Sequence, residues 1–227
     1  MAGKPVRSAF ENLARGFESN SIFGHMHSYD LYRSWLEAVW AFLDAVHHPD
    51  GYQQCLDRYT REQGEEFGRL LALYVDAVEA DPFRDILGEI FMRLDVKSVA
   101  AGQYFTPMSI AEMMARMQFE KAAFERQIQE KGYVTVCDPA VGSGVMLLAF
   151  AKVVHAELGR AALAKVRFFG TDIDQRCVLM CRIQLRMNGL DAVGRMAGLL
   201  GTLERNTPAQ DASPKPGRQP VLPGVAA

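Results

Sequence analysis

Three kinds of local structure follow one another between Val134 and Leu148, where the sequence reads VTVCDPAVGSGVMLL. The stretch opens with β-branched residues and breaks at Asp138-Pro139. It then passes two glycines and continues as an apolar run with helical character. This order predicts a strand, a tight loop and a helix, which together form the first half of a βαβ unit. The expected fold class is therefore α/β.

The two glycines of this loop, Gly142 and Gly144, suit a ligand-binding turn. Without Cβ atoms they can adopt a positive φ and let a ligand approach the backbone closely. The loop amides and the positive end of the following helix would then face an anionic or polar group. Asp138, at the carboxyl end of the strand, can accept hydrogen bonds from a ligand's ammonium or from loop amides. From this stretch alone, a strand-to-helix turn without a ligand remains the alternative.

A second strand is predicted where the sequence reads VRFFGTDID, from Val166 to Asp174. In doubly wound sheets, a carboxylate at the end of the second strand typically binds ribose hydroxyls. A nicotinamide site would favour the motif G-x-G-x-x-G, but the residue three positions after Gly144 is Leu147. The pattern therefore favours a nucleoside ligand without a pyrophosphate.

Three ordered segments resemble motifs of S-adenosylmethionine-dependent DNA adenine-N6 methyltransferases. The glycine loop, D-P-A-V-G-S-G at Asp138–Gly144, resembles that family's D-P-A-C-G-S-G motif. Gly102–Pro107, G-Q-Y-F-T-P, resembles its G-Q-F-F/Y-T-P motif, and Gly170–Asp174, G-T-D-I-D, resembles its G-x-D/E-I-D ribose motif. The similarity is greatest to type I restriction modification subunits and their plasmid-borne relatives, and it covers roughly Asp81 to Gly198.

The resemblance implies S-adenosyl-L-methionine as the cofactor. It places two residues against the cofactor's methionine part, four at its amino-acid and sulfonium end, one on the ribose and one on the adenine. In that order they are Phe105 and Thr106; Asp138, Ala140, Gly142 and Gly144; Asp172; and Ile173. It also implies a partial methyltransferase sheet of the Rossmann-like kind.

The family's catalytic tetrapeptide, D/N/S-P-P-Y/F/W, should follow the ribose motif. It would hold the amine of a flipped target adenine towards the sulfonium methyl, so the chemistry is mostly positioning. This sequence contains no Pro-Pro dipeptide, and no catalytic residue is assigned. Strands are predicted at 134–137, 166–170 and 193–197, whereas the full fold needs about seven. The glycine-loop strand should therefore have an open edge, which the N-terminal helices, a protein partner or a second copy would cover.

The first hundred residues are predicted to be helical. Apolar residues recur at helical spacing over 29–48 and again over 52–79. Asp81 and Pro82 have the character of an N-cap and first turn for a third helix. The expected organisation is a helical N-terminal region over 1–98, a cofactor-binding methyltransferase-like domain over 99–205 and a disordered tail over 206–227.

Thr106 and Pro107 are predicted to open the next helix, as a hydroxyl cap followed by proline. Four apolar side chains of this helix are expected to face inward: Ile110, Met113, Met114 and Met117.

Composition restricts the partners. The chain has 227 residues, 49% of them apolar, and a formal net charge of −2. Residues 1–100 carry 10 Lys and Arg against 16 Asp and Glu, whereas residues 101–205 carry 13 against 10. A DNA-binding surface needs a basic stripe. Four arginines could form one, but a solvated helix face is the favoured interpretation: Arg176, Arg182, Arg186 and Arg195. Contact with DNA is therefore expected to be weak or to occur through a partner.

A reduced, cytoplasmic location is expected. The apolar runs are too short to span a bilayer, and the N-terminus lacks the pattern of a signal peptide. The four cysteines form neither a zinc-type pair nor a disulfide framework, and Cys137 is expected in a core strand.

Three functions remain open from the sequence. The chain could bind S-adenosylmethionine and contribute to DNA methylation, with a partner supplying the catalytic element. It could be a non-catalytic or regulatory relative that binds the cofactor but has lost the substrate half. It could also be a protein-interaction module in which the glycine loop is a relic of the fold.

Overall fold

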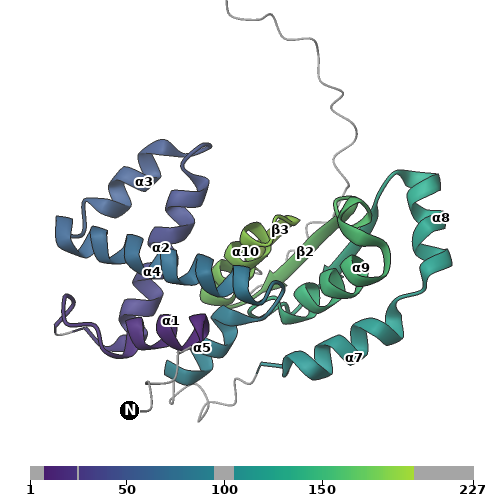
Figure 1. Cartoon of the computed structure of the whole chain (residues 1–227). Coiled ribbons are helices and arrows are strands. Elements are labelled where there is room, and N and C mark those ends of the chain that lie inside the picture. The colour runs from purple at the N-terminus through teal and green to yellow at the C-terminus, as the bar shows by residue number, and fades with distance from the viewer. Residues whose placement is uncertain (1–7, 25, 95–104, 197–227) are drawn as a thin grey trace, which may run out of the picture. The chain divides into compact units, whose positions relative to one another are not determined.

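A computed structural model of the chain describes residues 8–24, 26–94 and 105–196. Nine helices and three strands occur in these residues (Figure 1). The helices are α1 (Ala9–Glu18), α2 (Ser28–Asp44), α3 (Pro49–Leu56), α4 (Arg61–Ala80), α5 (Ile86–Leu94), α7 (Met108–Gln118), α8 (Lys121–Lys131), α9 (Val145–Leu163) and α10 (Gln175–Met187). The strands are β1 (Val134–Asp138), β2 (Val166–Asp172) and β3 (Asp191–Met196). Among the described helices, none has the length and apolarity that a membrane span requires.

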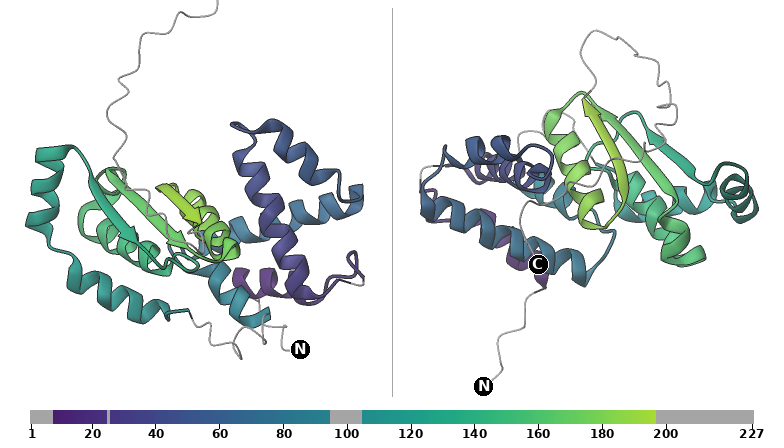
Figure 2. Two further views of the ribbon diagram at one scale, coloured as in Figure 1. Left: turned by 180° about the vertical axis from the view of Figure 1, so that it is seen from behind. Right: turned by 90° about the horizontal axis from the view of Figure 1, so that it is seen from above.

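The strands form a parallel sheet in the order β1-β2-β3 (Figures 1 and 2). Val134 is paired with Val166, and Arg167 with Asp191. Helix α9 connects β1 to β2, and α10 connects β2 to β3, as parallel strands require. The α/β class and the strand–loop–helix order are therefore confirmed. β1 lies at an edge of the described sheet, as expected.

One face of the sheet carries the core. Val134, Val166 and Phe168 are buried against apolar side chains of α9 and α10, such as Leu148 and Leu185. The alternate positions of the strands point to the other face, where Thr135, Cys137 and Arg167 are exposed. Cys137 lies in β1, as expected, but its side chain is exposed, because the described helices cover only the other face of the sheet.

The helical N-terminal region has its own aromatic core. The ring of Phe17 meets those of Tyr32 and Trp35 edge-on, each at a centroid distance of 5.2 Å, and Trp35 meets Tyr74 edge-on at 5.7 Å. Met180 of α10 belongs to the same buried cluster. The helix that follows β2 therefore packs on the helical region as well as on the sheet.

The predicted helix boundaries need two corrections before α5. The second helical stretch is two helices, α3 and α4, and Thr60 starts α4 with a capping box. Asp81 ends α4 instead of starting a helix, because its N–H donates to the carbonyl of Ala77. A turn follows in which Phe83 has a φ of 67°, and α5 begins only at Ile86.

The prediction for α7 is also wrong in orientation. Pro107 precedes the helix, and Thr106 makes no capping hydrogen bond. The buried residues are Ala111 and Ala115, which pack against Ala149 and Val153 of α9. The four apolar residues expected to face inward are instead 38–79% exposed: Ile110, Met113, Met114 and Met117. Small alanine side chains let α7 lie close to α9, which leaves Ile110, Met113 and Met117 exposed, whereas Met114 lines a cavity beside α9.

Candidate functional site

The glycine loop has the backbone that its sequence predicts. Gly142 has a φ of 53° and Gly144 a φ of 100°, both in the left-handed region that favours glycine. Gly144 also lies against α10, where an added Cβ would be 3.1 Å from Sγ and 3.3 Å from Cα of Cys181. The second glycine is therefore required by packing on α10 as well as by its backbone angle.

The tips of β1 and β2 meet at this loop. The carboxylate of Asp172 accepts a hydrogen bond of 2.9 Å from the N–H of Gly142. The N–H of Val141 donates to the carbonyl of Thr171, also at 2.9 Å. The side chain of Val141 packs on Gly170, where an added Cβ would be 2.9 Å from Cγ2 of the valine. The loop therefore closes onto the end of β2, and Gly170 makes that approach possible.

Both carboxylates at the strand tips are partly engaged by nearby backbone. Oδ1 of Asp138 accepts from the N–H of Ala140 at 3.0 Å. Oδ1 of Asp172 accepts from the N–H of Asp174 at 2.9 Å, in addition to the bond from Gly142. Because an ionised carboxylate offers about four acceptor positions, each retains capacity for further hydrogen bonds. Neither carboxylate is fully buried.

The segment Phe105-Thr106-Pro107 comes to the same loop from another part of the chain. An added Cβ at Gly142 would be 3.3 Å from two atoms of the Phe105 ring. That ring also packs on Phe91 of α5, with 5.3 Å between centroids. The first half of the motif, Gly102–Tyr104, lies outside the described residues.

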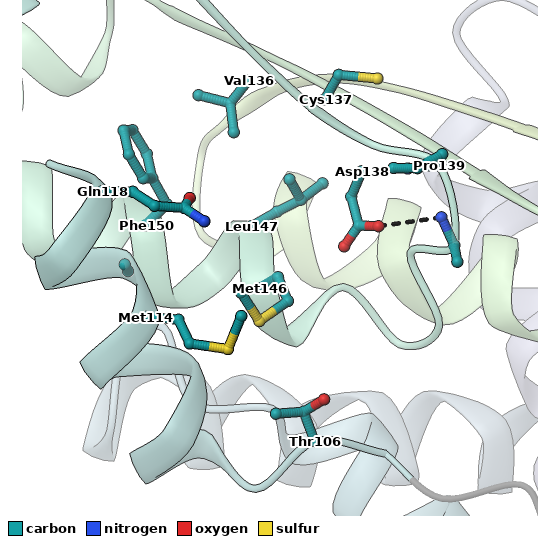
Figure 3. Close-up of a pocket in the computed structure, with 12 residues that line it drawn as sticks. Thr106, Met114, Gln118, Val136, Cys137, Asp138, Pro139, Met146, Leu147 and Phe150 are labelled. Atoms are coloured by element: carbon teal, nitrogen blue, oxygen red, sulfur yellow. Dashed lines mark hydrogen bonds between the residues drawn. The ribbon is translucent and has the colours of Figure 1, made fainter.

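One cavity adjoins the loop, and a second lies beside the segment Phe105–Met108. The first, of 380 Å³, lies between β1, α7 and α9, and its lining includes Thr106, Asp138 and Ala140 (Figure 3). In Figure 3, Met114 and Met146 lie across the cavity from the strand, and the thiol of Cys137 points away from them. This volume is within the usual range of small-ligand pockets.

The second cavity, of 310 Å³, has Phe105, Thr106 and Asp85 in its lining. The remaining predicted site residues, Gly142, Gly144, Asp172 and Ile173, line neither of these two cavities. Ile173 follows the carboxylate of β2 and is 71% exposed.

A buried polar cluster beneath the loop escaped the sequence analysis. The hydroxyl of Ser143 donates to Oδ2 of Asp85 at 2.7 Å. Nε2 of Gln184 donates to Oδ1 of Asp85 and to the carbonyl of Ser143, both at 2.8 Å. Burial raises the pKa of Asp85 above its ordinary value, and the hydrogen bonds donated to it oppose that rise. The sequence signals only one part of this cluster: an aspartate just before an apolar helix is typical of an N-cap. Asp85 does accept a hydrogen bond from the N–H of Gly88 in that manner.

The arginines considered as a basic stripe are largely occupied. Arg176 forms an ion pair with Asp174, the residue that caps α10. The guanidinium of Arg182 lies 3.7 Å from the ring centroid of Trp40, and burial lowers its pKa. Arg186 is exposed, and the side chain of Arg195 lies outside the described part. A continuous row of free cations is therefore absent from the described residues of α10.

The family model for N-6 DNA methylases matches residues 80–213. Over 126 residues the chain is 27% identical to a type I restriction enzyme methylase subunit of Mycoplasma pneumoniae. The aligned region is 52% of this chain but only 21% of that subunit, so the chain spans about a fifth of its relative's length.

Two solved structures are weakly similar, each at 15% sequence identity. One, from Listeria monocytogenes, is described as a class I S-adenosylmethionine-dependent methyltransferase; its TM-score is 0.42, with 83% of this chain and 52% of that chain covered. The other is a type I restriction-modification methyltransferase subunit from Streptococcus thermophilus, with a TM-score of 0.35 and coverage of 89% and 49%. The fold assignment above depends on the chain's own strand order and register. The family match extends over more than half of the sequence and includes the glycine loop and both strand tips. This chain belongs to the N-6 DNA methylase family.

Proposed function

We propose that this chain binds S-adenosyl-L-methionine across the tips of β1 and β2 and contributes to the methylation of adenine N6 in DNA. The observation that carries the proposal is the hydrogen bond of 2.9 Å from Gly142 to Asp172, with the Phe105 ring against the same glycine. It brings residues of three separate sequence segments to one loop.

The residues at the tips suit the chemical groups of this cofactor. Asp172 is partly exposed and can accept hydrogen bonds from ribose hydroxyls. Ile173 beside it offers an exposed apolar side chain to an adenine ring. Oδ2 of Asp138, at the 380 Å³ cavity, has no partner among the described residues and suits an ammonium group.

The start of α9 suits the cofactor's carboxylate. The first N–H groups of any helix have no partner within the helix and favour negative charge. Gly142 and Gly144 hold the loop in the left-handed backbone conformation that leads into this helix start. The cofactor, when bound, supplies a methyl group on a sulfonium. The role proposed for this chain is to bind and orient that group, with Thr106, Ala140 and Phe105 completing the contact surface.

Methyl transfer to DNA would require an element that positions the target adenine, and we propose that a protein partner of different sequence supplies it, while that partner or a second copy covers the outer edge of β1. The proposal is supported by the unpaired outer edge of β1 in the described sheet and by the single covered sheet face. Contact with DNA would then be weak in the isolated chain. The division into a helical region (1–98), a cofactor domain (99–205) and a tail (206–227) stays a prediction.

The alternative is a protein-interaction module in which the loop is a relic of the fold. In that case the hydrogen bond from Gly142 to Asp172 only closes the loop onto β2, and no ligand uses the remaining groups of the loop. A third function, a relative that binds the cofactor but does not contribute to methylation, is intermediate between these two.

Calorimetry on the purified chain separates these functions. We expect S-adenosylmethionine and S-adenosylhomocysteine to bind, and ATP, which carries phosphates in place of the methionine part, to bind much more weakly. If no heat of binding is detected at a cofactor concentration on the order of 0.5 mM, the proposal is contradicted, and the protein-interaction module is the remaining function. Transfer of a labelled methyl group to adenine-containing DNA, with and without added partner, then distinguishes a contributor to methylation from a non-catalytic relative.

A further inference from the structure

Besides Asp138, the glycine loop contains one polar side chain, that of Ser143, which lies between two glycines of positive φ. Ser143 is 0% exposed, so its side chain points into the protein and away from any ligand. Its hydroxyl donates to Asp85, which comes from the residues just before α5 in the helical region. The hydroxyl therefore attaches the loop to the helical region, in addition to the hydrogen bond that Gln184 of α10 donates to the Ser143 carbonyl.

We propose that Asp85 is a positioning residue for the cofactor loop: by holding Ser143 it fixes the backbone of Gly142 and Gly144 in the conformation that admits the cofactor. The inference rests on the proposed function. The inference adds Asp85, a residue that would not touch the cofactor, to the groups that determine cofactor affinity. The start of α5 thereby supports the binding site.

The energetics of the loop require such an attachment. Glycines lose more conformational freedom on folding than any other residue, so a loop with two of them is costly to hold in one conformation. The backbone bonds of Val141 and Gly142 fix the loop's first half to β2. The Ser143 hydroxyl fixes its second half from the opposite side, at a buried site where an unmet hydrogen bond is expensive.

The surroundings of Asp85 are arranged for this contact. Oδ1 accepts from the N–H of Gly88 at 3.1 Å and from Gln184 at 2.8 Å, which leaves Oδ2 for Ser143. An added Cβ at Gly88 would lie 2.6 Å from the Ser143 hydroxyl oxygen and would also overlap Asp85. Position 88 is therefore restricted to glycine because the cluster occupies the space.

Gln184 connects the same cluster to α10. Its Nε2 donates both to Asp85 and to the carbonyl of Ser143, and its Oε1 accepts from the N–H of Leu87 at 3.0 Å. Every described polar atom of this side chain is therefore used to join α10, α5 and the loop. Such a fully satisfied buried network specifies one arrangement of the groups it joins.

Asn188 offers a matched control. It is also a buried amide on this side of the protein, and it accepts from the N–H of Phe83 at 2.9 Å and donates to the carbonyl of Gln184 at 2.8 Å. It has no hydrogen bond to the glycine loop. A substitution there weakens the attachment of the helical region to α10 without releasing Ser143.

The test compares Ser143→Ala, Asp85→Asn and Asn188→Ala with the wild-type full chain. Cofactor affinity is measured by calorimetry, stability by thermal melting, and exchange of the Val141–Val145 amides by hydrogen–deuterium exchange without cofactor. We expect Ser143→Ala and Asn188→Ala to lower Tm to a similar extent. Of these two variants, only Ser143→Ala should lower the affinity for S-adenosylmethionine, by about tenfold, and speed exchange in the loop. Asp85→Asn should lower the affinity as well, because Asp85 holds the Ser143 hydroxyl. Because Asp85 acts through Ser143, the double variant Asp85→Asn with Ser143→Ala should lose no more affinity than the larger single loss.

Two results would overturn the inference. In one, Ser143→Ala and Asn188→Ala lose the same amount of cofactor affinity for the same decrease in Tm. The cluster would then only stabilise the fold. In the other, loop exchange is unchanged in Ser143→Ala. If the wild-type chain fails to bind the cofactor, the proposed function falls on its own. Faster loop exchange in Ser143→Ala, and normal exchange in Asn188→Ala, would still support Asp85 as the residue that fixes the loop.

Discussion

The N–H of Gly142 donates a hydrogen bond of 2.9 Å to the carboxylate of Asp172, and this bond joins the glycine loop to the end of β2. The residue predicted to bind ribose therefore also fixes the turn predicted to admit the cofactor's charged end. Because the Gly142 amide is occupied, the amides that remain to face a ligand are those at the start of α9. A change at Asp172 should consequently affect both the ribose contact and the loop.

Asp172→Asn should lower the affinity for S-adenosylmethionine by roughly 10- to 150-fold, because it removes charge-assisted hydrogen bonds of about 1.5–3 kcal/mol. The amide retains one oxygen for Gly142, so the fold should persist. Calorimetry measures the effect, and Glu157→Gln, an exposed position on α9, is the control. If affinity is the same in Asp172→Asn as in the wild type, the ribose assignment is wrong.

Gly170→Ala should destabilise the protein by about 1–3 kcal/mol. An added methyl group at position 170 would overlap the side chain of Val141, whose Cγ2 lies 2.9 Å from the site of the new carbon. Gly68→Ala is the matched control, because position 68 lies inside α4 with no atom within 4 Å of an added Cβ. That variant should gain roughly 0.5–1 kcal/mol from improved helix propensity. Urea unfolding of both variants measures the difference, and equal effects would contradict the proposed close approach.

The βαβ core could be predicted from the sequence because its determinants are local. Two glycines in a turn, β-branched residues before it and an apolar run after it each restrict the backbone within a few residues. The face of α7 that packs against α9 could not be predicted in the same way. Ile110, Met113, Met114 and Met117 form a stripe typical of a buried face, yet Ala111 and Ala115 allow a closer approach to α9. The spacing of apolar residues identifies both the methionine-rich face and the alanine face of this helix, but it does not predict which of the two is buried.

The Asp85 cluster was beyond sequence reasoning for a different reason. The partners of this carboxylate, Ser143 and Gln184, are 58 and 99 positions away in the chain. A lone aspartate before an apolar helix has the pattern of an ordinary N-cap, and Asp85 does serve as one for Gly88. Only the tertiary structure shows that the same side chain also reaches the glycine loop.

Two buried tyrosines of the helical core should respond in opposite ways to loss of their hydroxyl groups. The hydroxyl of Tyr32 donates to the carbonyl of Leu87 at 2.8 Å, so Tyr32→Phe should cost about 1 kcal/mol. The hydroxyl of Tyr74 is buried and has no hydrogen-bond partner among the described residues. Tyr74→Phe should therefore be neutral or stabilising, because it removes an unsatisfied polar group. Chemical denaturation of the two variants checks this, and a larger loss for Tyr74→Phe would refute the assignment.

Stability should fall at alkaline pH because of the buried thiols of α10. Burial raises the pKa of both Cys177 and Cys181 to about 12, whereas in the unfolded chain these thiols ionise near their ordinary value of about 8.5–9. Between these values the unfolded state loses protons that the folded state keeps, so the folded state is disfavoured as pH rises. The loss should approach roughly 1.4 kcal/mol per thiol and per pH unit.

Thermal melting from pH 8 to pH 10.5 measures this loss, and the double variant Cys177→Ala with Cys181→Ala should show a shallower decline. Exposed Cys137 provides the internal comparison, since it should react with a thiol reagent in the folded protein at pH 8 while the two buried thiols do not. An unchanged slope in the double variant, or rapid modification of Cys181 in the native state, would show that α10 does not hold these thiols away from water. It would also remove the support on which Gly144 rests, because the glycine packs directly on Cys181.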